Sequence, residues 1–139
     1  MLLAALLSSA LMTFAVMPAY AGTRRQMVRT INFVRSWGHI HGLHFSRRLS
    51  GGAAAWARHL MQINVIAHSG PAIDRGEGEV IEWHTGTRPQ VRDVVGEWLR
   101  SPPHRVVMLA RDYRRAGAGR AVGYIGGRRA TIWVVRFAR

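Results

Sequence analysis

The chain contains no cysteine and no lysine, and only 7 of its 139 residues are acidic. Without cysteine, disulfide bonds, thiol chemistry and thiolate metal sites are excluded, so an exported fold of this sequence must be held together by packing alone. Without lysine, all 20 basic residues are arginine, and the formal net charge is +13. These arginines are scattered along the chain after residue 21, a distribution typical of a solvated surface rather than of one binding stripe.

A charge this positive attracts polyanions such as nucleic acid, anionic lipid or an acidic wall polymer at low ionic strength. No motif of interleaved aromatic and basic residues accompanies the charge, so we expect no specific nucleic-acid recognition. Polyanion binding through the arginine-rich surface is therefore one functional hypothesis for this protein, and it ranks lowest of three.

Residues 1–21 carry no charge and are mostly Leu, Ala, Met, Val and Phe. The run ends in Pro18 and then Ala19-Tyr20-Ala21, a small-residue pattern typical of a cleavage site. We therefore expect residues 1–21 to be a signal peptide, residues 22–139 to form one domain, and the protein to be secreted. The alternative is an uncleaved leader that anchors the protein in a membrane, because the apolar run approaches the about 20 residues that span a bilayer.

Apolar residues at helical spacing predict four helices. The first covers about residues 23–37 and the second follows Ser46 as N-cap, with a stripe formed by Leu49, Ala53, Trp56 and Leu60. The third runs from about residue 89 to residue 100 with Pro89 in its first turn, and a short helix covers about residues 105–110.

Two β-rich runs, residues 118–125 and 131–137, flank Gly126-Gly127 and predict a hairpin. Helices first, a hairpin last and no alternation of strand and helix favour an α+β domain with an antiparallel sheet. His39, His41 and His44 lie in a loop without nearby carboxylates, so we interpret them as exposed rather than as a metal site.

Several short motifs follow one another in a fixed order along the chain. The earlier ones are Ile31-Asn32-x-x-Arg35, Gly42-Leu43, Leu49 and Ala55-Trp56-Ala57. The stronger ones are His68-Ser69-Gly70, Gly78-Glu79-Val80-Ile81, Trp98-Leu99-x-Ser101-Pro102-Pro103-His104-Arg105, Met108-Leu109, Tyr113, Gly117-x-Gly119 and Trp133-Val134-x-x-Phe137. In this order and spacing, the chain resembles bacterial members of the CAP superfamily, the cysteine-rich secretory, antigen 5 and pathogenesis-related 1 proteins.

The resemblance implies an α-β-α sandwich with a small antiparallel sheet between helices. It also implies a surface cleft in which His68, Glu79 and His104 converge. Two imidazoles and a carboxylate suit zinc or another divalent cation, with coordination positions left open. The resemblance implies no organic cofactor.

One departure from the family concerns a second glutamate, whose place is taken here by Ser101. Glu97 lies one helical turn earlier, about 5.4 Å along the same face, and is a candidate auxiliary residue together with Ser101. We interpret Glu77 and Glu82, the other acidic residues near Glu79, as surface charge.

Two functional hypotheses use this cleft. The first is a noncatalytic extracellular binding module that accepts a cell-envelope component or a small apolar ligand. The alternative is a metal-dependent hydrolase in which His68, Glu79 and His104 are the catalytic candidates. A serine hydrolase is disfavoured because no G-x-S-x-G motif surrounds Ser69.

Overall fold

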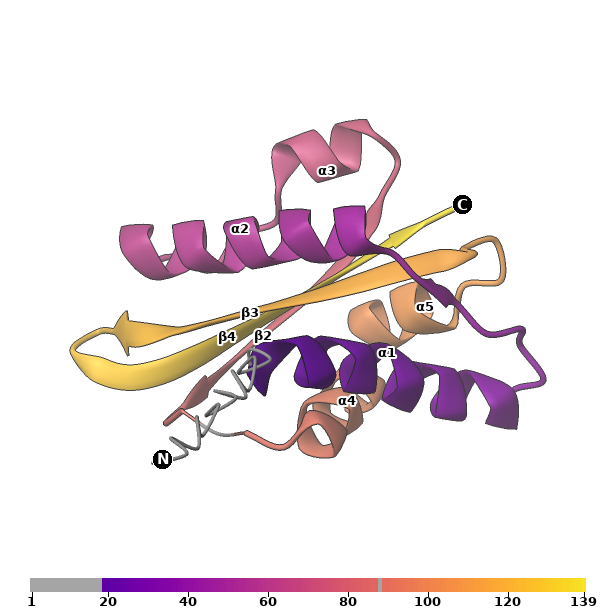
Figure 1. Cartoon of the computed structure of the whole chain (residues 1–139), viewed down its shortest axis with the longest axis horizontal. Coiled ribbons are helices and arrows are strands. Elements are labelled where there is room, and N and C mark those ends of the chain that lie inside the picture. The colour runs from indigo at the N-terminus through magenta and orange to yellow at the C-terminus, as the bar shows by residue number, and fades with distance from the viewer. Residues whose placement is uncertain (1–18, 88) are drawn as a thin grey trace, which may run out of the picture.

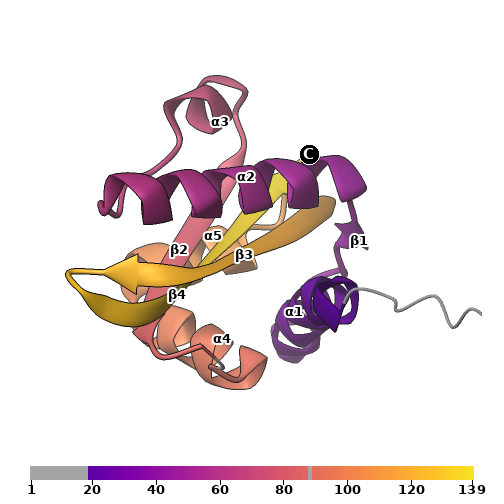
Figure 2. The same cartoon turned by 60° about the vertical axis from the view of Figure 1, so that its left-hand side comes forward.

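The computed structural model describes residues 19–87 and 89–139. These residues form three layers (Figures 1 and 2). Helix α2 (Arg47–Ile63) and the short α3 (Gly70–Asp74) lie on one side of a sheet, while α1 (Ala19–Trp37), α4 (Val91–Arg100) and α5 (Pro102–Leu109) lie on the other. The prediction of an α+β fold with an α-β-α sandwich is confirmed.

The described part of the chain has one four-stranded sheet with the order β1-β3-β4-β2. The strands are β1 (His44–Phe45), β2 (Gly78–Thr85), β3 (Arg115–Ile125) and β4 (Arg128–Ala138). Strands β3 and β4 form the predicted hairpin, and the positive φ angles of Gly126 and Gly127, 56° and 75°, permit its tight turn. Strand β2 pairs antiparallel with β4 and forms one edge of the sheet. The two-residue β1 forms the other edge and pairs parallel with β3, so the sheet is antiparallel, as predicted, except at this short strand.

Helix α2 lies directly on the backbone of β3. A Cβ atom on Gly117 would lie 2.2 Å from the backbone N of Ser50, and one on Gly119 would lie 2.0 Å from the backbone N of Ala54. The Ser50 hydroxyl also accepts a hydrogen bond of 3.0 Å from the backbone N–H of Ala118. The motif Gly117-x-Gly119 therefore permits a contact between strand and helix that any side chain would block.

Apolar side chains fill both interfaces of the sheet. The larger core lies between the sheet and α1, α4 and α5, and includes the fully buried Trp98, Trp133 and Phe137. The smaller core lies under α2 and includes Leu60 and Ile132. Because neighbouring residues of β2 point to opposite faces, Val80 enters the first core and Ile81 the second.

Arg35 links α1 to the loop that follows it and to the end of α5. The side chain is fully buried and donates hydrogen bonds to the carbonyl oxygens of His41, Met108 and Ala110, at 3.1, 2.8 and 2.9 Å. One turn earlier, the Asn32 amide pairs with both backbone groups of Leu43. The motif Asn32-x-x-Arg35 thus closes the loop after α1 and fixes the end of α5.

Three predicted helix boundaries need correction. Helix α1 begins at Ala19 rather than near residue 23. Helix α4 begins at Val91 with Gln90 as N-cap, so Pro89 precedes the helix instead of lying in its first turn. Helix α5 begins at Pro102 rather than near residue 105. The first turn of a helix needs no N–H partners, so Pro102 and Pro103 begin α5 as well as preventing α4 from continuing.

The predicted signal peptide, residues 1–21, falls almost entirely outside the described residues. Helix α1 begins at Ala19, inside the expected cleavage pattern. In the described ranges, no helix is both long and apolar enough to cross a membrane. Both the secretion signal and the membrane-anchor alternative therefore stay predictions.

Candidate functional site

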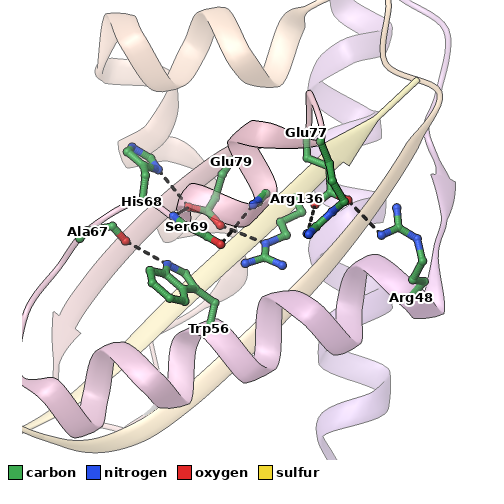
Figure 3. Close-up of polar contacts among 10 residues, drawn as sticks. Arg48, Trp56, Ala67, His68, Ser69, Glu77, Glu79 and Arg136 are labelled. Carbon is green, nitrogen blue, oxygen red and sulfur yellow. Dashed lines mark hydrogen bonds and ion pairs between the residues drawn. The ribbon is translucent and has the colours of Figure 1, made fainter.

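Glu79 lies at the centre of a buried polar network (Figure 3). Its side chain is 1% exposed. Oε2 accepts a hydrogen bond of 3.0 Å from Nε of Arg136, which lies directly opposite on β4. Oε1 accepts one of 2.9 Å from the backbone N–H of Ser69 and lies 3.1 Å from Nδ1 of His68. Three donors therefore engage both oxygens of this carboxylate.

Arg136 was not predicted as a site residue, although it balances the buried charge of Glu79. The residue is 5% exposed and lies beneath α2. A Cβ atom on Gly52 would approach its guanidinium to 2.6 Å, so the glycine in α2 leaves the space that Arg136 occupies. The sequence did carry a signal: Arg136 is the single charge in the apolar run 131–137, and a buried charge needs a partner.

His68 lies just before α3, with a side chain that is 51% exposed. Its neighbour Ser69 caps α3 through its hydroxyl and donates its backbone N–H to Glu79. An ionised carboxylate only accepts hydrogen bonds, so the contact with Glu79 assigns the ring proton of His68 to Nδ1. Nε2 is then the ring nitrogen left for a ligand, which is the arrangement that carboxylates impose on metal-binding histidines.

His104 reaches the same edge of the sheet from α5. Its Nδ1 is buried and has no hydrogen-bond partner among the described residues. Burial lowers the pKa of His104 below its usual value, and His68 lowers it further while Glu82 raises it. The folded protein therefore favours the neutral imidazole, which is the form that binds metal. Two imidazoles, one of them oriented by a carboxylate, fit a divalent cation.

The structure thus brings His68 and Glu79 into contact and places His104 within electrostatic range of His68. We call these three residues the His68 site. Ser101, a candidate auxiliary residue, lies at the junction of α4 and α5, where its backbone N–H bonds to the carbonyl oxygens of Glu97 and Trp98. The metal role predicted for the His68 site stays a prediction.

A different set of side chains forms the tightest donor cluster. Glu82, His84 and Glu97 each offer an atom, and these three atoms lie within 4.8 Å of one another. No other group of three His, Asp or Glu residues meets that distance in residues 19–87 and 89–139. Glu97, predicted as auxiliary to the His68 site, instead lies beside His84. Sequence reasoning interpreted Glu82 as surface charge and did not consider His84, although their i, i+2 spacing on a strand places them on one face.

The interpretation of Glu77 as surface charge is wrong. Its side chain is 3% exposed and is bound by Arg48 at 3.0 Å and Arg75 at 3.1 Å. Burial raises the pKa of Glu77, but the hydrogen bonds from Arg75 and Arg48 outweigh burial and hold the pKa below its usual value. Glu77 therefore stabilises the turn before β2. By contrast, His39, His41 and His44 are exposed, as predicted.

Three surface hollows on the described residues are lined by side chains other than those of the His68 site. One of them is lined by Arg48, Arg75, Arg115 and Arg139 together with Glu77. The cleft expected around His68 stays a prediction, while this arginine-lined hollow is a place where anions would be attracted.

Several solved structures share the fold. An extracellular protein containing an SCP domain from Bacillus anthracis is 20% identical with a TM-score of 0.65, and the match covers 86% of this chain and 41% of that protein. An outer surface protein from Borrelia burgdorferi is 18% identical with a TM-score of 0.60, over 83% of this chain and 91% of that one. NaASP2, crystallised with Zn²⁺, is 14% identical with a TM-score of 0.62, over 84% and 78%.

The chain therefore spans less than half the length of the Bacillus protein. No curated protein sequence matches it significantly. The model of the cysteine-rich secretory protein family, CAP, matches residues 28–137, which include nearly all of the described sheet and helices α2 to α5. The motifs, the three-layer fold and this match lead to one conclusion: the chain belongs to the CAP family.

Proposed function

We propose that this protein is a secreted, noncatalytic binding module in which His68 and His104 hold a divalent cation beside a site for a cell-envelope component or a small apolar ligand. The extracellular location is supported by the predicted leader and by the similarity to an extracellular and an outer-surface protein. A metal is supported by the similarity to NaASP2, which was crystallised with Zn²⁺. Zinc is accordingly the first cation to test.

The observation that carries this proposal is the contact between Glu79 and His68. A buried glutamate, itself fixed by Ser69 and Arg136, holds Nδ1 of a half-exposed histidine and leaves Nε2 free. A divalent cation bound there would supply a Lewis-acidic, positively charged point for the ligand. Glu79 then serves the site by orienting His68 from behind, as carboxylates do for metal-binding histidines.

The same contacts favour binding over hydrolysis. A general base needs a free lone pair within hydrogen-bond reach of the water or hydroxyl that it deprotonates. Both oxygens of Glu79 already accept hydrogen bonds, and the side chain is 1% exposed. Glu79 is therefore poorly suited to the role of base that the hydrolase alternative assigns to it.

Exposed apolar side chains flank His68 along the chain. Ile63, Val65 and Ile66 precede it and Ile73 follows it, with exposed fractions of 46%, 51%, 41% and 56%. All four lie within residues 63–73, and a contiguous apolar surface is typical of an interaction site. This surface supports an apolar ligand, or the apolar part of an envelope component, as the class of molecule bound near the ion.

The metal is tested by calorimetric titration of the metal-stripped protein with zinc and with manganese. We expect the His68→Ala, His104→Ala double variant to lose one equivalent of bound zinc. The matched control is His44→Ala, since His44 is an exposed histidine on the far edge strand β1. Unchanged zinc binding in the double variant would refute the proposed ion at His68 and His104.

The ligand class is tested separately with a fluorescent long-chain fatty acid and with purified peptidoglycan. Saturable binding that weakens when Ile66 and Ile73 are changed to serine supports the apolar surface. If both probes fail to bind, the ligand proposal is wrong even where zinc binds. A purely electrostatic attachment through the arginine-lined hollow would instead fall steeply with salt and be unaffected by these two serines.

A further inference from the structure

The second cluster of donors lies on the opposite face of β2 from Glu79. Glu82 and His84 are two residues apart on the strand, so both side chains point to the face that α4 and α5 cover. Glu97 on α4 approaches from that layer and places Oε2 at 3.4 Å from Nε2 of His84. We call Glu82, His84 and Glu97 the Glu82 site. It is built from two separate elements and shares no residue with the His68 site.

The spacing of the donors suits a small cation. Zinc binds imidazole nitrogen and carboxylate oxygen at about 2.0–2.2 Å, so two ligands in tetrahedral geometry lie about 3.3 Å apart. The separation of 3.4 Å between His84 and Glu97 matches this spacing, and the third donor lies within 4.8 Å of both. Carboxylates rotate easily, so a small movement of Glu82 would bring a third ligand to a cation held by His84 and Glu97.

A buried nitrogen of His84 is available to a ligand. Nε2 of His84 is buried, yet it forms no hydrogen bond with any described residue, Glu97 included. A buried polar atom without a partner destabilises the fold, because it has lost its hydrogen bonds to water without replacement. A bound cation would satisfy this nitrogen and bring Glu97 closer in one step. The His84 side chain is 18% exposed and that of Glu97 is 40% exposed, so an ion can enter from solvent.

Charge distribution supports the same conclusion. Among the described residues, arginine lies within 4.0 Å of Glu77, Glu79, Asp93 and Asp112. Glu82 and Glu97 have no such partner there, although the chain has 20 arginines. Within residues 19–87 and 89–139, the one hydrogen bond that Glu82 accepts comes from the backbone N–H of Trp83, at 3.2 Å. Two adjacent carboxylates without arginine attract a cation between them.

We propose that Glu82, His84 and Glu97 form a second binding site, which holds a divalent transition-metal ion such as zinc. One imidazole and two carboxylates supply three protein ligands, and the remaining position stays open to water or to an anionic ligand. The site bridges β2 and α4 and is independent of the ion proposed at His68 and His104.

The test is a zinc titration of the metal-stripped full chain, with His84→Ala and Glu97→Gln compared against wild type. Each variant removes one ligand from a half-buried position, and thermal unfolding without metal checks that both remain folded. We expect one class of zinc sites to weaken by about 100-fold or more, beyond the 10–100-fold that outer partners contribute. His44→Ala, which removes an exposed histidine elsewhere, should bind as wild type does.

The two sites are separated by the His68→Ala, His104→Ala variant. If this variant keeps the zinc class that His84→Ala loses, the Glu82 site is supported whatever happens at His68. If His84→Ala and Glu97→Gln both bind zinc as wild type does, the Glu82 site is refuted. Loss of all zinc in the His68, His104 variant would also refute it as an independent site. Replacing His104 in this variant also tests whether the Glu82 site depends on it, because His104 interacts electrostatically with Glu82.

Discussion

The two faces of strand β2 carry similar side chains in opposite states. On the α2 face, Glu79 is 1% exposed, and arginine, histidine and a backbone N–H fill both of its oxygens. On the α4 face, Glu82 and Glu97 have no arginine partner among the described residues, and the buried Nε2 of His84 has no hydrogen bond. One strand therefore separates a satisfied network from an unsatisfied one.

This difference assigns different roles to the two glutamates on the strand. A buried carboxylate that accepts three hydrogen bonds has a fixed position and can orient a neighbour, but it has little capacity left for a new ligand. Half-buried donors that lack partners have that capacity. We therefore infer that Glu79 is a positioning residue for His68, while Glu82 is available to bind an ion directly.

Disrupting the polar network around Glu79 should have the largest effect on stability. Arg136→Leu leaves Glu79 buried and charged without its main partner, and removing one member of a buried pair costs about 3–5 kcal/mol. We expect a loss of that size in the free energy of unfolding measured in urea. Arg129→Leu on the same strand is the control, because Arg129 is exposed and should change stability by less than about 0.5 kcal/mol.

A double variant sharpens this result. Glu79→Leu combined with Arg136→Leu removes both charges together, and apolar replacements of a buried pair are often neutral. Much of the stability lost in Arg136→Leu should return, while zinc binding by His68 should not. A double variant as unstable as the single one would show that Arg136 acts through packing rather than through charge.

Zinc bound at the Glu82 site should stabilise the folded protein. A ligand at 100 times its dissociation constant adds about 2.7 kcal/mol to the free energy of unfolding. In the His68→Ala, His104→Ala background, only the Glu82 site remains, so zinc should still raise the melting temperature by several degrees. Adding Glu97→Gln to that background should abolish the rise. An equal rise with and without Glu97 would place the stabilising ion elsewhere.

The sequence predicted the elements well where local periodicity decides them. The stripe of Leu49, Ala53, Trp56 and Leu60 identified α2, and the Gly-Gly turn identified the β3–β4 hairpin. Helix α3 was not predicted, because five residues are too few to show a helical period. The start of α4 was misplaced since Pro89 fits equally well before an N-cap and in a first turn.

The site was less predictable because its contacts are long-range. Glu79 and Arg136 are 57 residues apart, and only the register of β2 against β4 places them opposite each other. The same holds for His84 and Glu97, whose contact depends on how α4 packs against β2. A motif indicates which residues matter, but the partner of a buried charge depends on strand pairing and helix packing.

The positioning role of Glu79 is tested by comparing two glutamates with similar burial. Glu79→Gln replaces the acceptor that holds Nδ1 of His68, and the loss of an outer partner typically weakens metal binding 10–100-fold. Glu77→Gln removes a carboxylate that is 3% exposed and paired with arginine but does not touch His68. Both variants should be less stable than wild type, and only Glu79→Gln should weaken zinc binding at the His68 site. Equal zinc affinity in the two variants would contradict the positioning role.

The smallest expected effect is a pH dependence on the α4 side, measured in EDTA. Burial keeps the pKa of His104 below its usual value in the folded protein, whereas the unfolded chain binds this proton near pH 6.5. As the pH falls below about 6.5, the unfolded state takes up more protons than the folded state, so stability is lost; above that pH the residue contributes nothing. His104→Asn removes this source of pH dependence, so the free energy of unfolding should fall less steeply between pH 7.5 and 5 than in wild type. His44→Asn, at an exposed position, is the control. Identical slopes in wild type and His104→Asn would show that His104 is as well solvated as an exposed residue. The α4 side of β2 would then be more hydrated than expected from His84 Nε2 and His104 Nδ1, which are buried without a hydrogen-bond partner among the described residues.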